Sequence, residues 1–537
     1  MPATSPAHLD ANDTPFDSDQ AVTTGAPLPR SDSSPTGPQD GSIARSGDKL
    51  GYLTAALQRA VVAPIKAFRI TYLPLLMVYF AYGALGLVAV AQGFWEKKGL
   101  SLSPTDLAQL GVWLALPWAI KMVFGELVDT VAILGSRRRI YVFLGASLVA
   151  ASLVMMAGAA GGWLTFASKN VIYIAASLLS VLGVVLQDVV ADAMSTEVVP
   201  RTDADGAPRD QAAIDYDLGM VQALGRLALY LGILLTARLA GWLAQTFAYE
   251  TVFLIGLAIP LVSVTGAVLV RLEPAESRPT DWRILGGGLV FGTFVVGVGV
   301  FGVPFGQEII FVVSVAVIVA MLERVTRDVG PDVRRRIAYA ALLIFAFRSV
   351  PGVGAGYSWF TIDKLGFDEE FFGRLNEIGA FLGLAAAWLL SDAITRQPVA
   401  RVLLWLTFAG LVLAIPNFML VMGTYEWTER VFGIGARGIA LIDAAAQSPL
   451  VQVSMIPLLT LTAIYAPPAQ RATWFALMAS FMNLALVAGQ LQTKYLNQIF
   501  QVNRGQYDNL PELLAVVVAI GFIVPIAAIL LIGRRVR

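Results

Sequence analysis

Charged side chains inside apolar segments are the residues of this sequence that could do chemistry. Lys121 lies within "ALPWAIKMVFGELVDT", and Asp188 and Asp192 lie within "LGVVLQDVVADAM". A charge deep in a bilayer is costly and is rarely kept without a partner or a wet cavity. Asp188 and Asp192 are four residues apart and share one helix face. Lys121 is expected at a similar depth, so the spacing predicts that it pairs with Asp188.

This predicted pair is open to three interpretations. In the first, Lys121 binds either the carboxylate of an anionic substrate or that of Asp188, and one replaces the other. In the second interpretation Asp188, with Asp192 beside it, takes up a proton and couples transport to a proton gradient. The third is a structural ion pair that braces the N-terminal half.

Arg348 is the corresponding candidate in the C-terminal half. It precedes "SVPGVGAG", whose proline and glycines predict a break in the helix. Broken helices often line the substrate site of transporters, and an arginine suits two-pronged recognition of a carboxylate. The alternatives are a snorkelling arginine or a hydrogen bond between helices.

Three further residues are candidates for substrate contact. Arg374, which Glu377 could neutralise, lies near the outer end of a helix. Trp359 could stack on a flat heterocycle or anchor the chain at the membrane interface. Lys494 could face a cavity together with Gln490, four residues before it.

The composition predicts the setting in which these side chains lie. The chain has 537 residues, of which 57% are hydrophobic and 14% are charged, whereas soluble domains carry about 25% charged residues. There is no cysteine, and the one histidine is His8, so a disulfide, a cysteine-ligated metal and an intramembrane histidine relay are excluded. No cofactor or metal is expected, no nucleotide-binding loop is visible, and the zero net charge predicts no nucleic-acid partner.

Apolar stretches of membrane-spanning length begin at residue 70. Residues 1–47 read as a disordered cytoplasmic tail and residues 48–69 as an amphipathic interfacial helix. We predict two six-helix halves, an N-terminal one over residues 70–272 and a C-terminal one over residues 337–537. The connector, 273–336, holds two more apolar runs. We therefore expect fourteen spans, with twelve as the alternative.

Basic residues, mostly arginines, cluster in alternate loops, which predicts that both termini are cytoplasmic. We expect a multi-pass protein of the cell (inner) membrane. We expect the protein to contact the lipid bilayer and to be a monomer.

Several motifs resemble one family. Gly125-x3-Asp129, Gly135 and the basic run Arg137–Arg139 look like the loop between helices 2 and 3 of the major facilitator superfamily. "PWAIK", "GELVD", "GSRRRIY", "QDVVADAMSTE" and "FRSVPGVGAGYSWFTIDKLGFDEEFFGRL" resemble, in this order, motifs of the folate–biopterin transporter family. Near the C-terminus, "ATWFALMASFMNLALVAGQ" and "YDNLPELL" are similar to its helices 11 and 12.

The resemblance implies an all-α major facilitator fold and a secondary active transporter for an anionic folate-like or pterin-like solute, which we expect to be proton-coupled. It implies that Gly125, Asp129, Arg137, Arg138 and Arg139 form a gating loop that latches the two halves. A muropeptide permease or another organic-solute permease of the superfamily is an alternative, as is a non-transporting assembly factor. A membrane enzyme is not expected, because no catalytic constellation is visible.

Overall fold

The computed structural model describes a helical protein without extended sheets in the part of the chain that it covers. Only isolated β-bridges occur there, each within a loop. The described residues are 68–136, 138–203, 205–269, 280, 282–327, 329–395, 397–465 and 471–535. The predicted tail and most of the predicted interfacial helix, as well as Arg137, lie outside them.

The first group of helices covers the predicted N-terminal half. After the short 3₁₀ turn η2 (Ile70–Tyr72), its helices are α3 (Leu73–Ala84), α4 (Gly86–Lys98), α5 (Pro104–Ala119), α6 (Lys121–Thr130), α7 (Arg139–Gly161), α8 (Lys169–Glu197), α9 (Gln211–Thr246), α10 (Tyr249–Ile255) and α11 (Ala258–Leu269).

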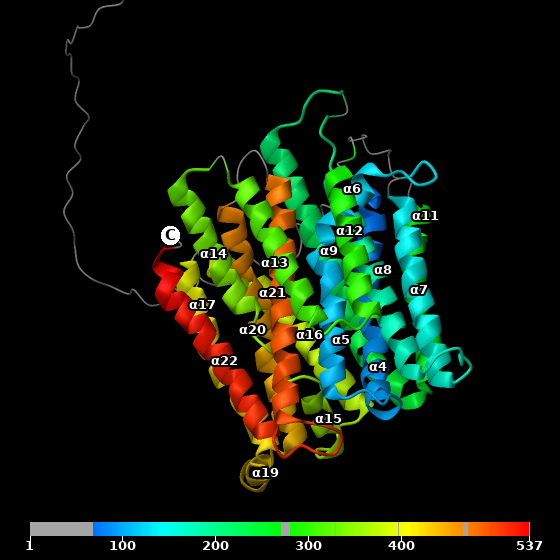
Figure 1. The fold of residues 1–537 in the computed structure, drawn as a ribbon, viewed down its shortest axis with the longest axis vertical. Helices are drawn as coiled ribbons and strands as arrows, with labels where there is room; N and C mark the ends of the chain where they lie inside the picture. The colour runs from blue at the N-terminus through cyan, green and yellow to red at the C-terminus, as the bar shows by residue number, and fades with distance from the viewer. Residues whose placement is uncertain are drawn as a thin grey trace, which may run out of the picture. The chain divides into compact units, whose positions relative to one another are not determined.

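The second group covers the predicted C-terminal half. Its helices are α14 (Pro331–Arg348), α15 (Ala355–Asp363), α16 (Glu369–Thr395), α17 (Val399–Val412), α18 (Ile415–Val421), α19 (Tyr425–Phe432), α20 (Ala436–Ile464), α21 (Arg471–Phe500) and α22 (Leu510–Ile532), followed by the 3₁₀ turn η4 (Gly533–Arg535). In Figure 1 most of this group lies to the left and most of the first group to the right.

A helical hairpin lies between the two groups. Its helices, α12 (Trp282–Val300) and α13 (Gly306–Val325), are the two apolar runs of the predicted connector, and Figure 1 shows them at the front of the molecule. Val298 and Ile310 of the hairpin join a buried cluster with Val112 and Leu116 of α5 and Leu484 of α21. The hairpin therefore packs along the seam between α5 and α21.

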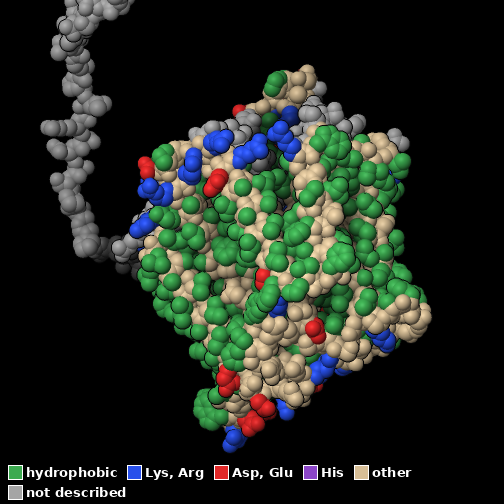
Figure 2. Space-filling view, viewed as in Figure 1, with side chains coloured by type: hydrophobic (Ala, Val, Ile, Leu, Met, Phe, Trp, Pro, Cys, Tyr) green, Lys and Arg blue, Asp and Glu red, His purple; other side chains and the backbone are tan. Residues whose placement is uncertain are grey.

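Nine helices or helix pairs within the described residues are long and apolar enough to cross a membrane, or ten if the bent pair α5–α6 counts as one span. The structure places helices within 70–272, within the connector and within 337–537, but the count of fourteen spans stays a prediction. Figure 2 shows a broad apolar belt, with Lys and Arg side chains gathered along the upper edge in this view. The chain passes from α6 to α7 at the upper edge in Figure 1, and we name this the Arg138 face, after the residue before α7. We name the opposite face, where α4 ends, the Lys97 face.

Local sequence explains where the helices that carry the candidate residues break. At the start of α5, the Ser103 hydroxyl accepts a hydrogen bond from the backbone N–H of Asp106, whose carboxylate accepts one from the Ser103 N–H. This capping box satisfies two otherwise unpaired amides. α5 ends just after Pro117, and the chain bends by 40° into α6. The helix that carries Arg348 stops at this residue and resumes at Ala355, after Gly354 with φ +83°, a value that favours glycine.

Candidate functional site

Lys121 lies between two carboxylates inside the first group. Its Nζ is 2.5 Å from Asp188 Oδ2 and 2.6 Å from Asp192 Oδ2. Tyr79 of α3 donates a hydrogen bond of 2.7 Å to Asp192 Oδ1. The structure thus brings together the lysine and the aspartate that the sequence predicted to pair, and adds Asp192 and Tyr79.

The fold positions this cluster through the break between α5 and α6. Lys121 is the first residue of α6, so the bend directs its side chain from the α6 N-terminus onto α8. The two aspartates follow each other by one turn on α8 and present both carboxylates to the same ammonium. The Asp188 side chain is 13% exposed and that of Asp192 is 48% exposed. Asp192 is therefore the more accessible of the two acids.

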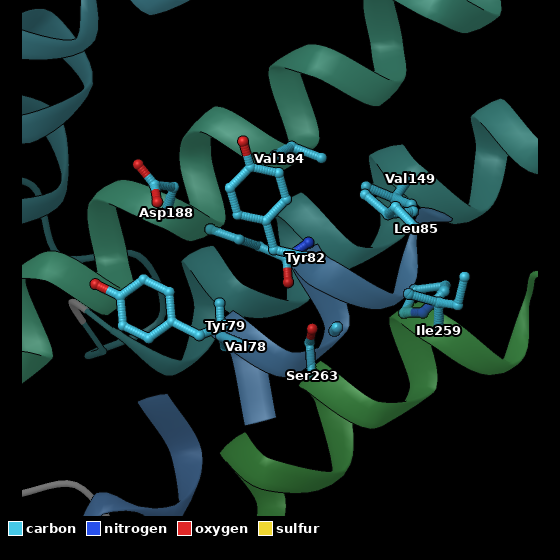
Figure 3. Close-up of a pocket in the computed structure, with 12 residues that line it drawn as sticks. Val78, Tyr79, Tyr82, Leu85, Val149, Val184, Asp188, Ile259 and Ser263 are labelled. Carbon is cyan, nitrogen blue, oxygen red and sulfur yellow. The ribbon is translucent and has the colours of Figure 1, made fainter. Parts of the chain in front are cut away.

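A small pocket adjoins the Asp188 side chain (Figure 3). Its volume is about 20 Å³, and Tyr79, Tyr82, Gln187 and Ser263 contribute to its lining. A cavity of this size holds about one water molecule. The Ser263 hydroxyl is buried without a hydrogen-bond partner among the described residues, so a water here would satisfy a group that the protein leaves unpaired.

Arg226 of α9 is a cation that the sequence reasoning missed. It is exposed, its charge acts on Asp188, Tyr79 and Tyr82, and it forms no ion pair with the side chains that the structure describes. The signal was available, since Arg226 is one of two arginines in the apolar range 217–243. The argument that singled out Lys121 applies to it equally.

Arg348 is largely buried at the end of α14. Its Nη1 lies 3.2 Å from the Met455 sulfur, and its Nε is buried without a hydrogen-bond partner. No described carboxylate neutralises it. A desolvated guanidinium with unused donors is costly, and this state is expected where an anionic ligand completes the site.

The weaker candidates lie elsewhere in this conformation. Arg374 is exposed and pairs with Glu370 at 2.6 Å. Trp359 is 2% exposed. The Arg504 guanidinium lies over its ring at 4.6 Å. Lys494 pairs with Glu308 of α13 at 2.5 Å. The structure brings none of the three next to Lys121, and their substrate contacts stay predictions.

The predicted gating loop is held within the first group. Arg138 Nη2 is 2.8 Å from Asp129 Oδ1 and 2.5 Å from Glu197 Oε1, and Nη1 donates to the carbonyl of Val128 at 2.8 Å. Arg139 lies over the Phe143 ring at 5.5 Å. A Cβ added at Gly125 would meet open space. In this conformation Arg138 thus ties α6 to α8, and among the described residues it pairs with no acidic side chain of the second group.

Two ion pairs join the two groups at the Lys97 face. Lys97 pairs with Asp363 at the end of α15, and Lys98 pairs with Glu369 of α16 at 2.9 Å. Arg504, in the loop before α22, donates hydrogen bonds to the carbonyls of residues 96, 97 and 100 at 2.9, 2.9 and 2.6 Å. We call these residues the Lys97 gate. Both groups contribute to it, so these ion pairs and hydrogen bonds join the two groups at this face.

The Asp363 carboxyl of this gate lies beyond the predicted span 337–360. Burial acts to raise its pKa, but hydrogen bonds from Lys97 and Tyr507 and the charges of Lys97 and Lys364 outweigh burial. The pKa of Asp363 is therefore lower than usual, and its ionised form is favoured in the closed gate.

Comparison with known proteins assigns the family. The model of the BT1 family matches residues 83–537 of the chain. The chain belongs to the BT1 family. The predicted resemblance to folate–biopterin transporters is thereby confirmed.

Relatives with assigned names support the same conclusion. The folate-biopterin transporter of Synechocystis sp. is 28% identical over 459 residues, covering 84% of this chain and 80% of the relative. Probable folate-biopterin transporter 4 of Arabidopsis thaliana is 22% identical, covering 87% and 96%. Folate transporter 2 of Plasmodium falciparum is 19% identical, covering 83% and 84%. These relatives are transporters, so this member of the BT1 family is a membrane transporter and not an enzyme.

Solved structures show the fold. A POT family transporter in complex with 5-aminolevulinic acid superposes with a TM-score of 0.62 at 13% identity, covering 87% of this chain and 96% of that one. Another, in complex with a thioalcohol-conjugated peptide, has a TM-score of 0.61 at the same identity. The all-α, multi-pass major facilitator fold expected from the sequence is confirmed.

Proposed function

We propose that this BT1 family member is a secondary active transporter that moves an anionic organic solute of the folate or pterin class, coupled to protons. The observation that carries the proposal is Arg348, a largely buried guanidinium with an unpartnered Nε at a helix break. A carboxylate of the solute would satisfy it through charge-assisted hydrogen bonds. The names of the relatives suggest the solute class.

The cluster around Lys121 supplies the coupling in this proposal. One ammonium faces two carboxylates, so the cluster carries a net negative charge when both are ionised. A proton taken up by Asp188 or Asp192 releases one of the bonds to Lys121. The freed donor then binds a second anionic group of the solute, so that proton and solute bind together. Arg226, exposed nearby, adds positive charge that favours the solute anion.

The two groups would alternate access around these residues. The Lys97 gate closes one face, while Arg138 of the predicted gating loop pairs only within the first group. This arrangement supports a state open toward the Arg138 face, which we infer to be cytoplasmic from its arginines. The two six-helix halves would move as units, and the protein would work as a monomer in the inner membrane.

The test is uptake of labelled folate and pterin into proteoliposomes under an imposed pH gradient. We expect Arg348→Ala to abolish binding and uptake, and Arg348→Lys to weaken binding by about tenfold, because the charge stays but the two-pronged geometry is lost. Arg430→Ala, at an exposed arginine of α19, is the matched control and should transport normally.

A second variant separates coupling from substrate recognition. Asp188→Asn should leave binding of labelled solute measurable while uptake no longer responds to the pH gradient. If wild-type uptake ignores the gradient, proton coupling is wrong. If no folate or pterin binds to the folded protein, the proposed solute class is wrong.

A further inference from the structure

A lateral groove separates α9 of the first group from α16 of the second. Its volume is about 730 Å³. The groove is lined by Leu235, Leu239 and Trp242 of α9 and Phe381 of α16, all of which are exposed. Exposed large apolar side chains on span Leu224–Thr246 face lipid. We therefore infer that the groove opens toward the acyl chains of the bilayer. None of its lining residues belongs to the Lys121 cluster.

Two charged residues lie inside this groove. Arg238 Nη1 and Glu377 Oε2 are 3.4 Å apart, and their side chains are 59% and 37% exposed. Charge-assisted hydrogen bonds are usually about 2.7–2.9 Å long, so the pair is loosely held. A guanidinium has five N–H donors, and the one long contact leaves most of them unused. Both charges thus remain able to bind a ligand.

Arg238 and Glu377 lie equally far from the neighbouring ends of their helices. Arg238 lies about two helical turns, roughly 12 Å, from the end of α9 at Thr246, and Glu377 lies equally far from the start of α16 at Glu369. Long cationic side chains extend from such positions toward the interface. Trp242, one turn nearer the helix end, is of the residue type that collects at headgroup level.

We propose that this groove binds a phospholipid whose headgroup carries a primary ammonium, such as phosphatidylethanolamine. Arg238 would bind the phosphate, and Glu377 would accept hydrogen bonds from the ammonium. The acyl chains lie along Leu235, Leu239 and Phe381. Charge complementarity selects this occupant: phosphatidylcholine has no N–H donor for Glu377, and phosphatidylglycerol has no cation at all.

The groove is lined by one helix from each group, so a lipid bound in it would contact both groups. α9 and α16 are in backbone contact at Gly241 and Gly373, where a Cβ added at Gly241 would lie 2.8 Å from the Gly373 Cα. The groove begins one turn from this contact. A lipid that bridges Arg238 and Glu377 therefore holds the two helices together and favours the closed Lys97 face.

Native mass spectrometry of the full chain, purified with an equimolar mixture of phosphatidylethanolamine, phosphatidylcholine and phosphatidylglycerol, tests the proposal. Wild-type protein should retain phosphatidylethanolamine about tenfold over the other two, the factor expected for one charge-assisted hydrogen bond. Glu377→Gln should abolish this preference while phosphatidylcholine retention stays unchanged. Arg238→Gln should lower retention of all three lipids, and Arg238→Lys should restore much of it.

Arg430→Gln, an exposed arginine on α19, is the matched control and should behave as wild type. Equal retention of the three lipids by wild-type protein would overturn the proposal. So would a preference for phosphatidylethanolamine that survives both Glu377→Gln and Arg238→Gln. Because Arg238→Lys keeps the charge, it also separates loss of the site from misfolding.

Discussion

Neutralising the acids of the Lys97 gate should open that face. The double variant Asp363→Asn, Glu369→Gln removes both ion pairs that join α4 to the second group. Lys97 and Asp363 are 12% and 31% exposed, so their charge-assisted hydrogen bond is worth about 1.5 kcal/mol. Lys98 is half exposed, and its pair with Glu369 is worth about 0.5 kcal/mol. Together they contribute about 2 kcal/mol, a shift of roughly thirtyfold toward the open state.

Distance measurements between spin labels can read this shift directly. The chain has no cysteine, so introduced cysteines label without background. Lys169→Cys at the start of α8 and Gln506→Cys before α22 are exposed positions on opposite groups. We expect the double variant to populate a longer distance between them. A second pair, Arg430→Cys with Gln506→Cys, lies within the second group and should not change.

The reasoning is refuted if the distance between the two groups stays as in the wild-type protein. The hydrogen bonds from Arg504 to the backbone would then hold the gate without the ion pairs. Arg504→Gln in the double variant distinguishes this outcome, because it removes those bonds as well.

Three further predictions concern the gate, the hairpin and the loop. In the closed gate the pKa of Asp363 is lowered. The ionised Asp363 carboxylate therefore stabilises the closed gate fully above the ordinary aspartate pKa of about 4. This stabilisation is lost as the pH falls through the lower pKa of the closed state. The label distance should stay constant from about pH 8 to 5 and lengthen only below about pH 4; an opening midpoint above pH 5 would contradict this. Glu308→Gln should lower the free energy of unfolding by about 3 kcal/mol, because it leaves the Lys494 ammonium buried without a carboxylate. The double variant Glu308→Gln, Lys494→Met should recover most of the loss in a denaturation experiment. Asp129→Ala should slow uptake while leaving solute affinity unchanged, since it removes one partner of Arg138 and leaves Lys121 and Arg348 in place. A changed dissociation constant with normal uptake would argue against it.

The approach of Lys121 to Asp188 could be predicted because both positions depend on local rules. The ends of the apolar segments give the depth of each residue, and helical periodicity gives its face. The same rules place Asp192 one turn from Asp188. They would also have identified Arg226, a charged residue within an apolar range, had they been applied to every span.

The partner of Lys494 could not be predicted in this way. Glu308 lies on the hairpin, and nothing in the local sequence says against which helix an additional apolar segment packs. Trp359 shows the same limit, because its ring is covered by Arg504 from a loop more than a hundred residues later in the chain. Depth and face follow from one helix, whereas pairing across helices depends on the arrangement of the whole bundle.

The contacts of the hairpin bear on how the two groups could move. Gln307 donates a hydrogen bond of 2.9 Å to the Gln109 carbonyl of α5, and Glu308 pairs with Lys494 of α21. These polar attachments lie together at the start of α13, next to the seam where α5 and α21 already pack.

Farther along the hairpin the contacts are apolar. Gly288 of α12 lies against the Val123 methyl groups of α6, and Gly299 lies near the Trp113 ring of α5. Apolar contacts without hydrogen bonds can slide at little cost, whereas the buried Glu308–Lys494 pair cannot separate without a large penalty. The hairpin should therefore remain attached to α21 while α6 moves past α12, so its presence in the connector is compatible with alternating access.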